Sequence, residues 1–316
     1  MTFNVFIDGE EGTTGLQIRE RLEARSEFSL VHLADSERKD PEARRTALVG
    51  ADVSILCLPD DASREAVGLV AGEDSRLIDA STAHRTADGW IYGFPEMAPG
   101  QRAQIAKATR VTNPGCYPTG AIALLAPLIS GGLLPANYPV TINAVSGYSG
   151  GGKPLIARME DQENENAISS GYFAYGLALE HKHVPEIVQH SGLRNRPLFV
   201  PSVGKFRQGM IVQIPLQLWS LPNKPSVAAI FEMLRDYYAD QKFVSVANNT
   251  EVVAHLALLD PEDLNDTNRL RLFVFGNEAH DQVVLTAQLD NLGKGASGQA
   301  VQNLNIMLGL PEEAGF

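Results

Sequence analysis

A glycine-punctuated turn near the start of the chain constrains the fold more than any other feature. The apolar run FNVFID (residues 3–8) leads into GEEGTTG (9–15), and LQIRERLEAR (16–25) follows with its apolar residues at helical spacing. A short strand, a tight glycine turn and an amphipathic helix in this order are typical of the first unit of a nucleotide-binding sheet. The opening of the chain therefore predicts a strand, a turn and a helix.

The same alternation continues through the first third of the chain. Further strands are predicted over 28–35, 51–60 and 75–82, and the segment 61–72 between two of them has helical spacing. Strands that alternate with helices form parallel sheets with helices on both faces. We therefore predict an α/β fold that begins with a Rossmann-type parallel sheet domain.

The sequence pattern changes beyond Pro114. A strongly apolar helix is predicted over 120–134, and longer alternating strands typical of a mixed or antiparallel sheet follow at 199–204, 210–218, 243–248 and 283–292. The last segment, 298–310, again has helical spacing. This favours a second α/β (α+β) domain, with boundaries that divide the chain into residues 1–115, 116–290 and 291–316.

Composition excludes several classes of protein. The 316 residues are 44% hydrophobic and carry a formal net charge of -12, which disfavours binding to the phosphate backbone of nucleic acid. No apolar run approaches the roughly 18 residues of a membrane span, and the start lacks a signal-peptide pattern, so we expect a cytoplasmic protein without a membrane partner. Two cysteines cannot form a four-cysteine metal site.

The glycine loop and the end of the second strand indicate a dinucleotide site. Gly9, Gly12 and Gly15 are spaced by three, with Thr13 and Thr14 between them, where a pyrophosphate can rest on free backbone N–H groups. Glycines at a plain tight turn are the alternative, and the site requires the carboxylates of Glu10 and Glu11 to face away from the phosphates. The residues that favour NADP over NAD are Ser36, Arg38 and Lys39, although a solvated loop of mixed charge would also contain them.

Cys116 is the candidate nucleophile. Pro114 and Gly115 force a turn directly before the apolar helix, so the sulfur is expected at a helix N-terminus, where the dipole and the free amides favour the thiolate. Cys57 lies inside an apolar strand and is interpreted as a small buried hydrophobic residue.

A thiolate nucleophile needs a nearby group that exchanges protons, and His181 and His183 stand two residues apart in HKHVPEI. No third ligand of suitable spacing accompanies them, so no metal site is predicted. The five other histidines are interpreted as surface or satisfied core residues. Two glycine-rich loops, 146–153 and 290–303, are candidate ligand loops, and SGYSGGGK suits a phosphate or carboxylate.

Four segments in this order, NPGCYPTG, SGYSGGGK, HKHVPEI and NLGKGASGQAVQN, resemble the N-acetyl-gamma-glutamyl-phosphate reductase family. The opening GEEGTTG, together with DASTAHR and YGFPE, is similar to the shorter form of that family, and the resemblance covers nearly the whole chain. The cysteine segment is shared more loosely with aspartate-semialdehyde dehydrogenase. That enzyme is the nearest alternative, and an NADP-binding regulator without turnover is a remote one.

The resemblance implies a function and a set of site residues. It implies NADPH-dependent reduction of an acyl phosphate to an aldehyde through a thioester on Cys116, with release of inorganic phosphate, by a homodimer or homotetramer. A protonated His181 would supply a proton, with His183 as the alternative acid/base and otherwise a substrate ligand. The resemblance places the following residues near the nicotinamide: Asn291, Lys294, Gly295 and Gly298. It places Arg207 at the substrate, although Gln208 and Gly209 follow that arginine where the family usually has glycine directly. The candidate substrate ligands on the SGYSGGGK loop are Ser146, Ser149 and Gly150.

Overall fold

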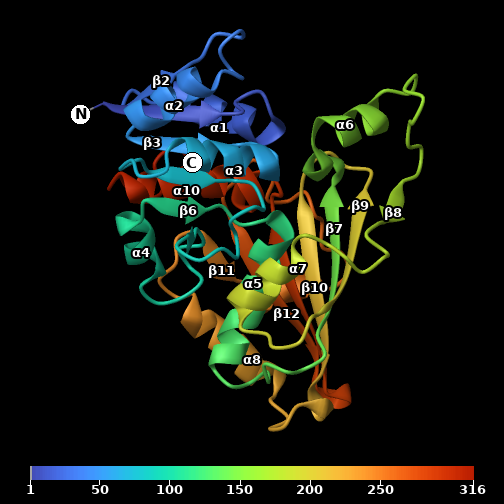
Figure 1. The fold of residues 1–316 in the computed structure, drawn as a ribbon. Helices are drawn as coiled ribbons and strands as arrows, with labels where there is room; N and C mark the ends of the chain where they lie inside the picture. Colours follow the sequence, from blue (N-terminus) through green and yellow to red (C-terminus); the bar gives the residue numbers. More distant parts are fainter. Residues whose placement is uncertain (1) are drawn as a thin grey trace. The chain divides into compact units, whose positions relative to one another are not determined.

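The computed structural model describes residues 2–316, which form two compact units (Figure 1). Unit 1 contains the described residues up to Gly115 together with Ala296–Phe316, and unit 2 contains Cys116–Gly295. Residues 291–295 therefore belong to unit 2. Within residues 2–316, none of the helices has the length and apolar character needed to cross a membrane.

Unit 1 is built on a six-stranded sheet in which all paired strands are parallel. The order across the sheet is β2-β1-β3-β4-β6-β5. Its strands are β1 (Phe3–Asp8), β2 (Phe28–Val31), β3 (Val53–Leu56), β4 (Leu77–Asp79), β5 (Ile91–Tyr92) and β6 (Arg110–Thr112). Strands β2 and β3 flank β1 on opposite sides, and this reversal of strand order creates the crevice in which open α/β sheets bind ligands.

Helices cover both faces of this sheet. The first face carries α1 (Thr13–Glu23), α4 (Gln101–Lys107) and α10 (Gly298–Met307), and the second carries α2 (Pro41–Gly50) and α3 (Asp60–Leu69). Alternation along β1 explains the two layers, because Val5 and Ile7 pack into the first apolar cluster and Phe6 into the second. The predicted parallel sheet with helices on both faces is confirmed.

Unit 2 is built on a seven-stranded mixed sheet with the order β11-β12-β13-β10-β7-β9-β8. Its strands are β7 (Thr141–Gly147), β8 (Tyr172–Ala174), β9 (Leu198–Gly204), β10 (Met210–Gln217), β11 (Val244–Val246), β12 (Leu270–Asn277) and β13 (Gln282–Leu289). Strands β12, β13, β10 and β7 pair antiparallel, whereas β7 pairs in parallel with β9 and β11 with β12. The predicted mixed sheet is therefore confirmed.

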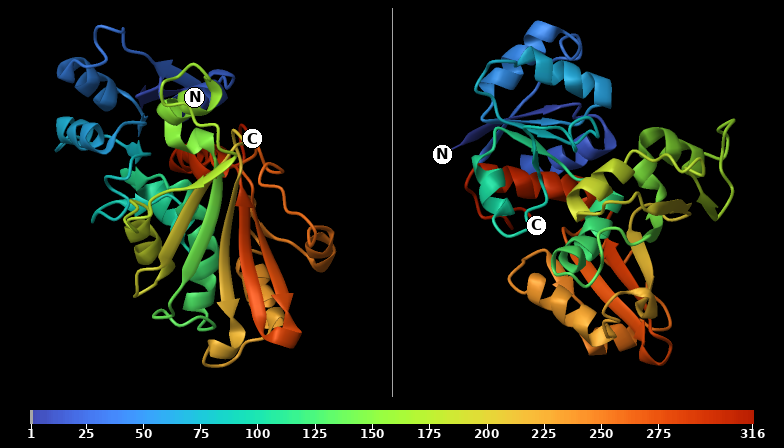
Figure 2. Two further views of the ribbon diagram at one scale, coloured as in Figure 1. Left: turned by 90° about the vertical axis from the view of Figure 1, so that its right-hand side faces the viewer. Right: turned by 60° about the horizontal axis from the view of Figure 1, so that its bottom comes forward.

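The long helices of unit 2 pack on its sheet. Helix α5 (Cys116–Ser130) contacts β10 and β13, α8 (Val227–Tyr237) contacts β11 and β12, and α7 (Val184–Ser191) packs against α5 (Figure 2). Two shorter helices, α6 (Gly152–Glu160) and α9 (Asn249–Ala254), complete the unit. Exposed Gln213, Pro215 and Gln217 alternate with buried residues along β10, as in a sheet with one covered face.

Element boundaries differ from the sequence prediction in two informative places. The helix predicted over 120–134 begins at Cys116 and ends at Ser130, so it starts at the cysteine itself. Residues 227–237 and 270–277, for which the sequence predicts no element, form α8 and β12. Helix α8 buries only Ile230 and Leu234, so few residues mark its apolar face in the sequence. Its stability as a helix depends on packing against the sheet.

Candidate functional site

The loop between β1 and α1 has the geometry of a phosphate cradle. Gly9 has a φ of +88°, and a Cβ added there would lie 2.5 Å from the carbonyl oxygen of Cys57. A Cβ on Gly15 would overlap the carbonyl oxygen of Gly9. Helix α1 starts at Thr13, and no side chain caps it and no acidic residue lies in its first turn. The backbone amides of this turn are therefore available to an anion.

A cavity of about 490 Å³ opens beside this loop, within unit 1. It lies at the carboxyl ends of β1 and β3, and its lining combines apolar and charged side chains. The lining residues are 6–11, Leu33, Arg38, Lys39, Arg44, Leu58, Ala62 and Glu65. A mostly concave site with apolar walls and a few charged groups is the usual form of a nucleotide pocket.

Carboxylates surround the predicted phosphate-binding arginine. The guanidinium of Arg38 lies 2.7 Å from Glu11, 3.1 Å from Asp35 and 3.8 Å from Glu10. Glu10 also lies 3.0 Å from His32. The two glutamates that the sequence analysis requires to face away from the phosphates thus point toward Arg38. Of the other predicted residues here, Lys39 lines the cavity, and Ser36 is exposed.

A buried ion pair lies in the wall of the same cavity and was not predicted. Arg44 of α2 donates to Asp8, the last residue of β1, from Nη2 at 2.9 Å and Nε at 3.1 Å, and both residues are 6% exposed. Burial raises the pKa of Asp8, although Arg44 opposes that shift. A third contact joins Arg44 to the exposed Glu65 at 3.1 Å.

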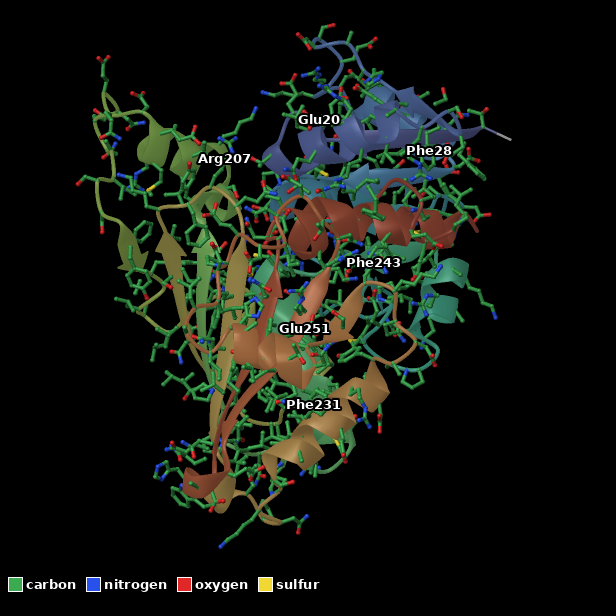
Figure 3. The ribbon with its side chains drawn as sticks, turned by 180° about the vertical axis from the view of Figure 1, so that it is seen from behind. Glu20, Phe28, Arg207, Phe231, Phe243 and Glu251 are labelled. Atoms are coloured by element: carbon green, nitrogen blue, oxygen red, sulfur yellow. The ribbon has the colours of Figure 1, made fainter. Side chains whose placement is uncertain are left out.

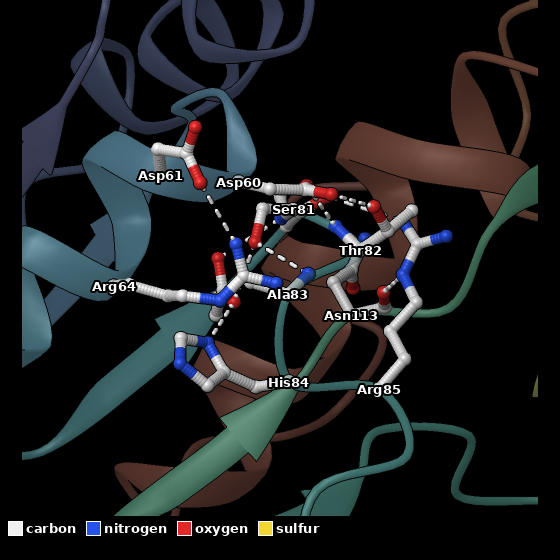
Figure 4. Close-up of polar contacts among 11 residues, drawn as sticks. Asp60, Asp61, Arg64, Ser81, Thr82, Ala83, His84, Arg85 and Asn113 are labelled. Carbon is white, nitrogen blue, oxygen red and sulfur yellow. Dashed lines mark hydrogen bonds and ion pairs between the residues drawn. The ribbon is translucent and has the colours of Figure 1, made fainter. Parts of the chain in front are cut away.

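The DASTAHR segment after β4 forms a dense polar network within unit 1 (Figure 4). The buried carboxylate of Asp79 accepts from the Ser81 amide at 2.9 Å and the Ser81 hydroxyl at 2.7 Å, and it lies 2.6 Å from Nδ1 of His84. The imidazole of His84 also stacks on Trp90, with ring centroids 4.4 Å apart. Arg85 donates from Nε to the carbonyl oxygen of Asn113 at 2.9 Å. His84 is thus a satisfied residue that fixes this loop.

In unit 2, Cys116 is the first residue of α5, where the helix dipole favours a negative charge. A Cβ on Gly295 would lie 2.8 Å from the Cβ of Cys116, so the 290–295 turn passes directly against the cysteine. The thiol is partly exposed. Cys57 is not fully buried as the sequence suggests, since it is also partly exposed, but desolvation and the Asp79 and Asp8 carboxylates raise its pKa to about 12.

The two histidines of HKHVPEI lie together before α7. Their ring centroids are 4.8 Å apart, and the backbone N–H of His183 donates to Nδ1 of His181 at 3.1 Å. His183 is 7% exposed and is the residue that precedes the helix. In residues 2–316, no three or more His, Cys, Asp or Glu side chains are grouped as they would be to hold a metal ion.

Two tyrosines that the sequence did not indicate join His181 to the start of α5. The hydroxyl of Tyr175 lies 3.4 Å from Nε2 of His181 and donates to the hydroxyl of Tyr117 at 3.3 Å. Tyr117 in turn donates to the carbonyl oxygen of Ser202 at 3.1 Å. Desolvation raises the pKa of Tyr175 to about 12, and the charge of Cys116 adds to the upward shift of both tyrosines. Tyr117, the residue after the cysteine, therefore links the hydroxyl of Tyr175 to the start of α5.

His181 is neutral near pH 7 in this structure. Desolvation, with a smaller contribution from Lys182, lowers its pKa to about 4. This differs from the protonated imidazole expected from the sequence, because the pattern HKH shows neither the burial of the ring nor the adjacent backbone donor.

Three predicted ligand residues and the β13 turn meet in unit 2. Asn291 donates from Nδ2 to the hydroxyl of Ser149 at 3.0 Å and accepts on Oδ1 from the amide of Gly209 at 2.8 Å. A Cβ on Gly150 would lie 3.2 Å from the hydroxyl of Ser146, which donates to the carbonyl oxygen of Gly147. Asn291 therefore ties the glycine-rich loop to the start of β10.

Two predicted residues have side chains engaged elsewhere. Arg207, on the loop before β10, donates to Glu160 at 2.5 Å and its side chain is 59% exposed (Figure 3). Lys294 is fully buried with its Nζ 5.5 Å from the ring centroid of Phe243. Gln208 stands where the family usually has glycine. Its side chain donates to Asp290 at 2.6 Å, and this hydrogen bond explains a glutamine at that position. Gly298 is buried at the first position of α10, in unit 1.

Comparison with known proteins gives two family models that together cover most of the chain. Residues 4–108 match a semialdehyde dehydrogenase NAD binding domain, and residues 116–291 match a semialdehyde dehydrogenase dimerisation domain. Unit 1 thus contains a dinucleotide-binding domain. N-acetyl-gamma-glutamyl-phosphate reductase 2 of Nostoc sp. is 56% identical, with 99% of this chain and 98% of the relative covered. N-acetyl-gamma-glutamyl-phosphate reductase of Brucella ovis is also 56% identical, with 96% and 98% covered.

Solved structures with the same fold come from more distant proteins. Aspartate semialdehyde dehydrogenase II of Vibrio cholerae, complexed with ASA, has a TM-score of 0.70 at 15% identity, covering 98% of each chain. Aspartate semialdehyde dehydrogenase of Candida albicans, solved with NADP, has a TM-score of 0.66 at 14% identity, covering 97% of this chain and 99% of that one. At this identity the likeness supports the fold alone.

Proposed function

Because the chain belongs to the N-acetyl-gamma-glutamyl-phosphate reductase family, we propose that it reduces N-acetyl-L-glutamyl 5-phosphate to N-acetyl-L-glutamate 5-semialdehyde and phosphate, with NADPH as reductant. The observation that carries the proposal is the position of Cys116 at the start of α5, beside a cluster that contains Tyr117, Tyr175 and His181. Relatives named for the glutamyl substrate at 55–56% identity favour it over aspartate semialdehyde.

The residues of unit 1 fit a dinucleotide. The glycine cradle leaves no room for a Cβ at Gly9 or Gly15, and the first-turn amides of α1 are available to a pyrophosphate. When bound, NADPH supplies the hydride for the reduction.

NADP is favoured over NAD by the cations that line the cavity. Arg38 and Lys39 follow β2, the position at which dinucleotide-binding domains contact the adenosine ribose, and both side chains line the cavity. A 2′-phosphate would carry about two negative charges and could replace the carboxylates now near Arg38.

The first half of the reaction acylates Cys116. Its thiolate, favoured by the N-terminus of α5, attacks the acyl carbon, and the C–O bond to phosphate breaks with both electrons going to phosphate. The backbone N–H groups of Cys116 and Tyr117 belong to the first turn of α5, where main-chain amides can donate to a developing oxyanion. The resulting thioester accepts a hydride far more readily than a carboxylate does.

His181, and not His183, is the imidazole that we assign to the acyl group. Its Nε2 faces the Tyr175 hydroxyl, whose pKa responds to the charge of Cys116. His183 is buried at the start of α7.

The other predicted residues keep their proposed roles. A substrate role is retained for Ser146, Ser149, Gly150, His183 and Arg207, and a role beside the reacting cysteine for Asn291 and Gly295. For Lys294 the buried side chain supports packing against Phe243.

The proposed function also bears on the oligomeric state of the protein and on its location in the cell. The match of residues 116–291 to a dimerisation domain supports a homodimer or homotetramer. A reactive thiolate that must stay reduced supports the cytoplasm, where thiols are kept reduced.

A substrate assay tests the proposal directly. NADP reduction should follow the addition of N-acetyl-L-glutamate 5-semialdehyde and phosphate, and aspartate semialdehyde at the same concentration should give a kcat/KM lower by at least 10²-fold, because a site built for an acetylated amine leaves an ammonium without a partner. Equal or greater activity with aspartate semialdehyde would overturn the proposed substrate.

The two cysteines provide a matched pair of variants. Cys116→Ser should abolish reduction while NADPH still binds, and Cys57→Ala should retain activity because the raised pKa of that thiol keeps it protonated and weakly nucleophilic. Cofactor binding is measured by fluorescence titration. Activity that survives Cys116→Ser would exclude the thioester mechanism.

A further inference from the structure

The hydrogen bond at Nδ1 fixes the tautomer of His181. The backbone N–H of His183 donates to this nitrogen at 3.1 Å, so Nδ1 uses its lone pair as an acceptor. A neutral imidazole carries one proton, and the nitrogen that accepts a hydrogen bond cannot carry it. The proton of neutral His181 is therefore on Nε2.

The neighbouring hydroxyls are consistent with a donor at Nε2. Tyr175 uses its own proton toward Tyr117, and Tyr117 uses its proton toward the carbonyl oxygen of Ser202. The oxygen of Tyr175 is then an acceptor for the Nε2–H of His181, at 3.4 Å. This distance is long for a hydrogen bond, so a charged acceptor that came closer would form a stronger one.

The donor is aimed at the region of the nucleophile. The Tyr175 hydroxyl that His181 faces donates to the hydroxyl of Tyr117, the residue that follows Cys116 at the start of α5. The rings of Tyr117 and His181 are also in edge contact, with centroids 6.1 Å apart, and Tyr117 directly follows the cysteine.

We propose that His181 acts as a neutral hydrogen-bond donor from Nε2 to the acyl oxygen carried by Cys116, and does not shuttle a proton. This deepens the proposed function and rests on it. The backbone amide of His183 sets the tautomer, so the side chain of His183 is not required for it.

The chemistry balances without a proton from His181. Thiolate attack gives an oxyanion, which collapses as the C–O bond breaks, and phosphate takes its proton from water. After hydride addition, the second oxyanion collapses, the C–S bond breaks, and its electron pair returns to sulfur, which releases the aldehyde and the thiolate. Each oxyanion needs a donor that stays in place, which Nε2–H supplies.

The surroundings of the ring oppose a second proton. Protonation at Nδ1 would break the bond from the His183 amide, and the positive charge of Lys182 lies beside the ring. The other titratable side chains in contact with it are Tyr117, Tyr175 and His183. The lowered pKa of His181, about 4, agrees with this geometry.

Nitrogen-15 NMR of histidine-labelled protein tests the tautomer without turnover. The His181 signals are assigned by their loss in His181→Gln. We expect one nitrogen with a bound proton and one without, unchanged between pH 8 and pH 5.5. A ring that becomes doubly protonated near pH 6.5, or that carries its proton on Nδ1, would overturn the proposal, and neither result depends on the identity of the substrate.

Kinetics of two variants test the role. Glutamine retains an N–H donor at the end of its side chain but cannot carry a proton, whereas alanine has no donor. His181→Ala should lower kcat by about 10²–10³-fold, and His181→Gln should recover activity to within roughly 10-fold of wild type. Equal losses in both variants, with a wild-type kcat inflection near pH 6.5 that His181→Gln removes, would favour a proton shuttle. If the wild-type enzyme does not turn over the substrate while the NMR result holds, the proposed function fails and the tautomer stands.

Discussion

Arg38 in unit 1 and His181 in unit 2 are both held in place before any ligand is present, but by different forces. Arg38 is partly exposed and lies among three carboxylates at 2.7–3.8 Å. His181 is held by a main-chain donor and by aromatic contacts with Tyr117, Tyr175 and Phe199. Charge contacts in water are weak and exchangeable, whereas a main-chain bond under partial burial is set by the fold.

The difference indicates how each site can change. A ligand with two negative charges can replace the carboxylates as the partner of Arg38. Substitution of a single charged residue should therefore change the affinity for that ligand. The proton position of His181 is set by the path of the backbone into α7, so side-chain substitutions around it should leave the tautomer unchanged. Coenzyme preference is therefore expected to be adjustable, and the acyl-oxygen donor fixed.

The largest expected effect is on stability, and it compares a buried ion pair with an exposed one in the unit 1 cavity. Arg44→Met leaves the buried Asp8 carboxylate without its main partner and should lower the free energy of unfolding by about 3–5 kcal/mol, as measured by urea denaturation. Arg38→Gln breaks contacts to more exposed carboxylates and should leave stability nearly unchanged. Similar losses in both variants would remove the distinction between buried and exposed ion pairs.

A second effect concerns coenzyme preference. Arg38→Gln should weaken NADPH binding on the order of 10- to 100-fold, because a charge-assisted bond to the 2′-phosphate is lost, while NADH binding stays the same. Fluorescence titration of both coenzymes measures this. Arg64→Gln, which removes the same charge from an exposed arginine of α3 that is not among the cavity-lining residues, is the control. Equal weakening of NADPH and NADH would place Arg38 away from the 2′-phosphate.

A third effect is a pH dependence of stability due to His181. Its pKa is about 4 in the folded chain and about 6.5 in the unfolded chain, so between these values the unfolded state binds a proton that the folded state does not. Stability therefore falls as pH drops from 7 to 5, by about 1 kcal/mol once the partial exposure of the ring is allowed for. Urea unfolding should show this extra loss in wild type and not in His181→Gln. Parallel pH curves would contradict the lowered pKa.

The sequence predicted the features that depend on neighbouring residues. The glycine spacing between β1 and α1 and the Pro114-Gly115 turn before Cys116 are local signals, and the structure has a tight turn and a helix start at those places. The order of strands and helices likewise gave the parallel sheet and the mixed sheet, since hydrophobic periodicity is also local.

The features that were missed depend on contacts between distant segments. Tyr175 meets Tyr117 across 58 residues, and Arg44 reaches Asp8 across 36, so no short pattern contains either pair. The protonation of His181 follows from backbone geometry and burial, which the letters HKH do not specify. The contact of Lys294 with Phe243, 51 residues earlier in the chain, is also long-range, and the predicted place of Lys294 near the nicotinamide stays a prediction.

The smallest expected effect tests whether the carboxylates around Arg38 compete with the coenzyme. Glu11→Gln removes the partner at 2.7 Å and one negative charge from the cavity, so both changes should tighten NADPH binding, by about 2- to 3-fold at low ionic strength. Raising the salt concentration should reduce the gain, because these charges are accessible to solvent. Glu23→Gln changes the net charge equally but removes only the α1 contact to Arg19, and it should leave the Kd for NADPH unchanged. An unchanged Kd in Glu11→Gln would mean that Arg38 is already available to the coenzyme, and its carboxylate contacts would then have no part in selectivity.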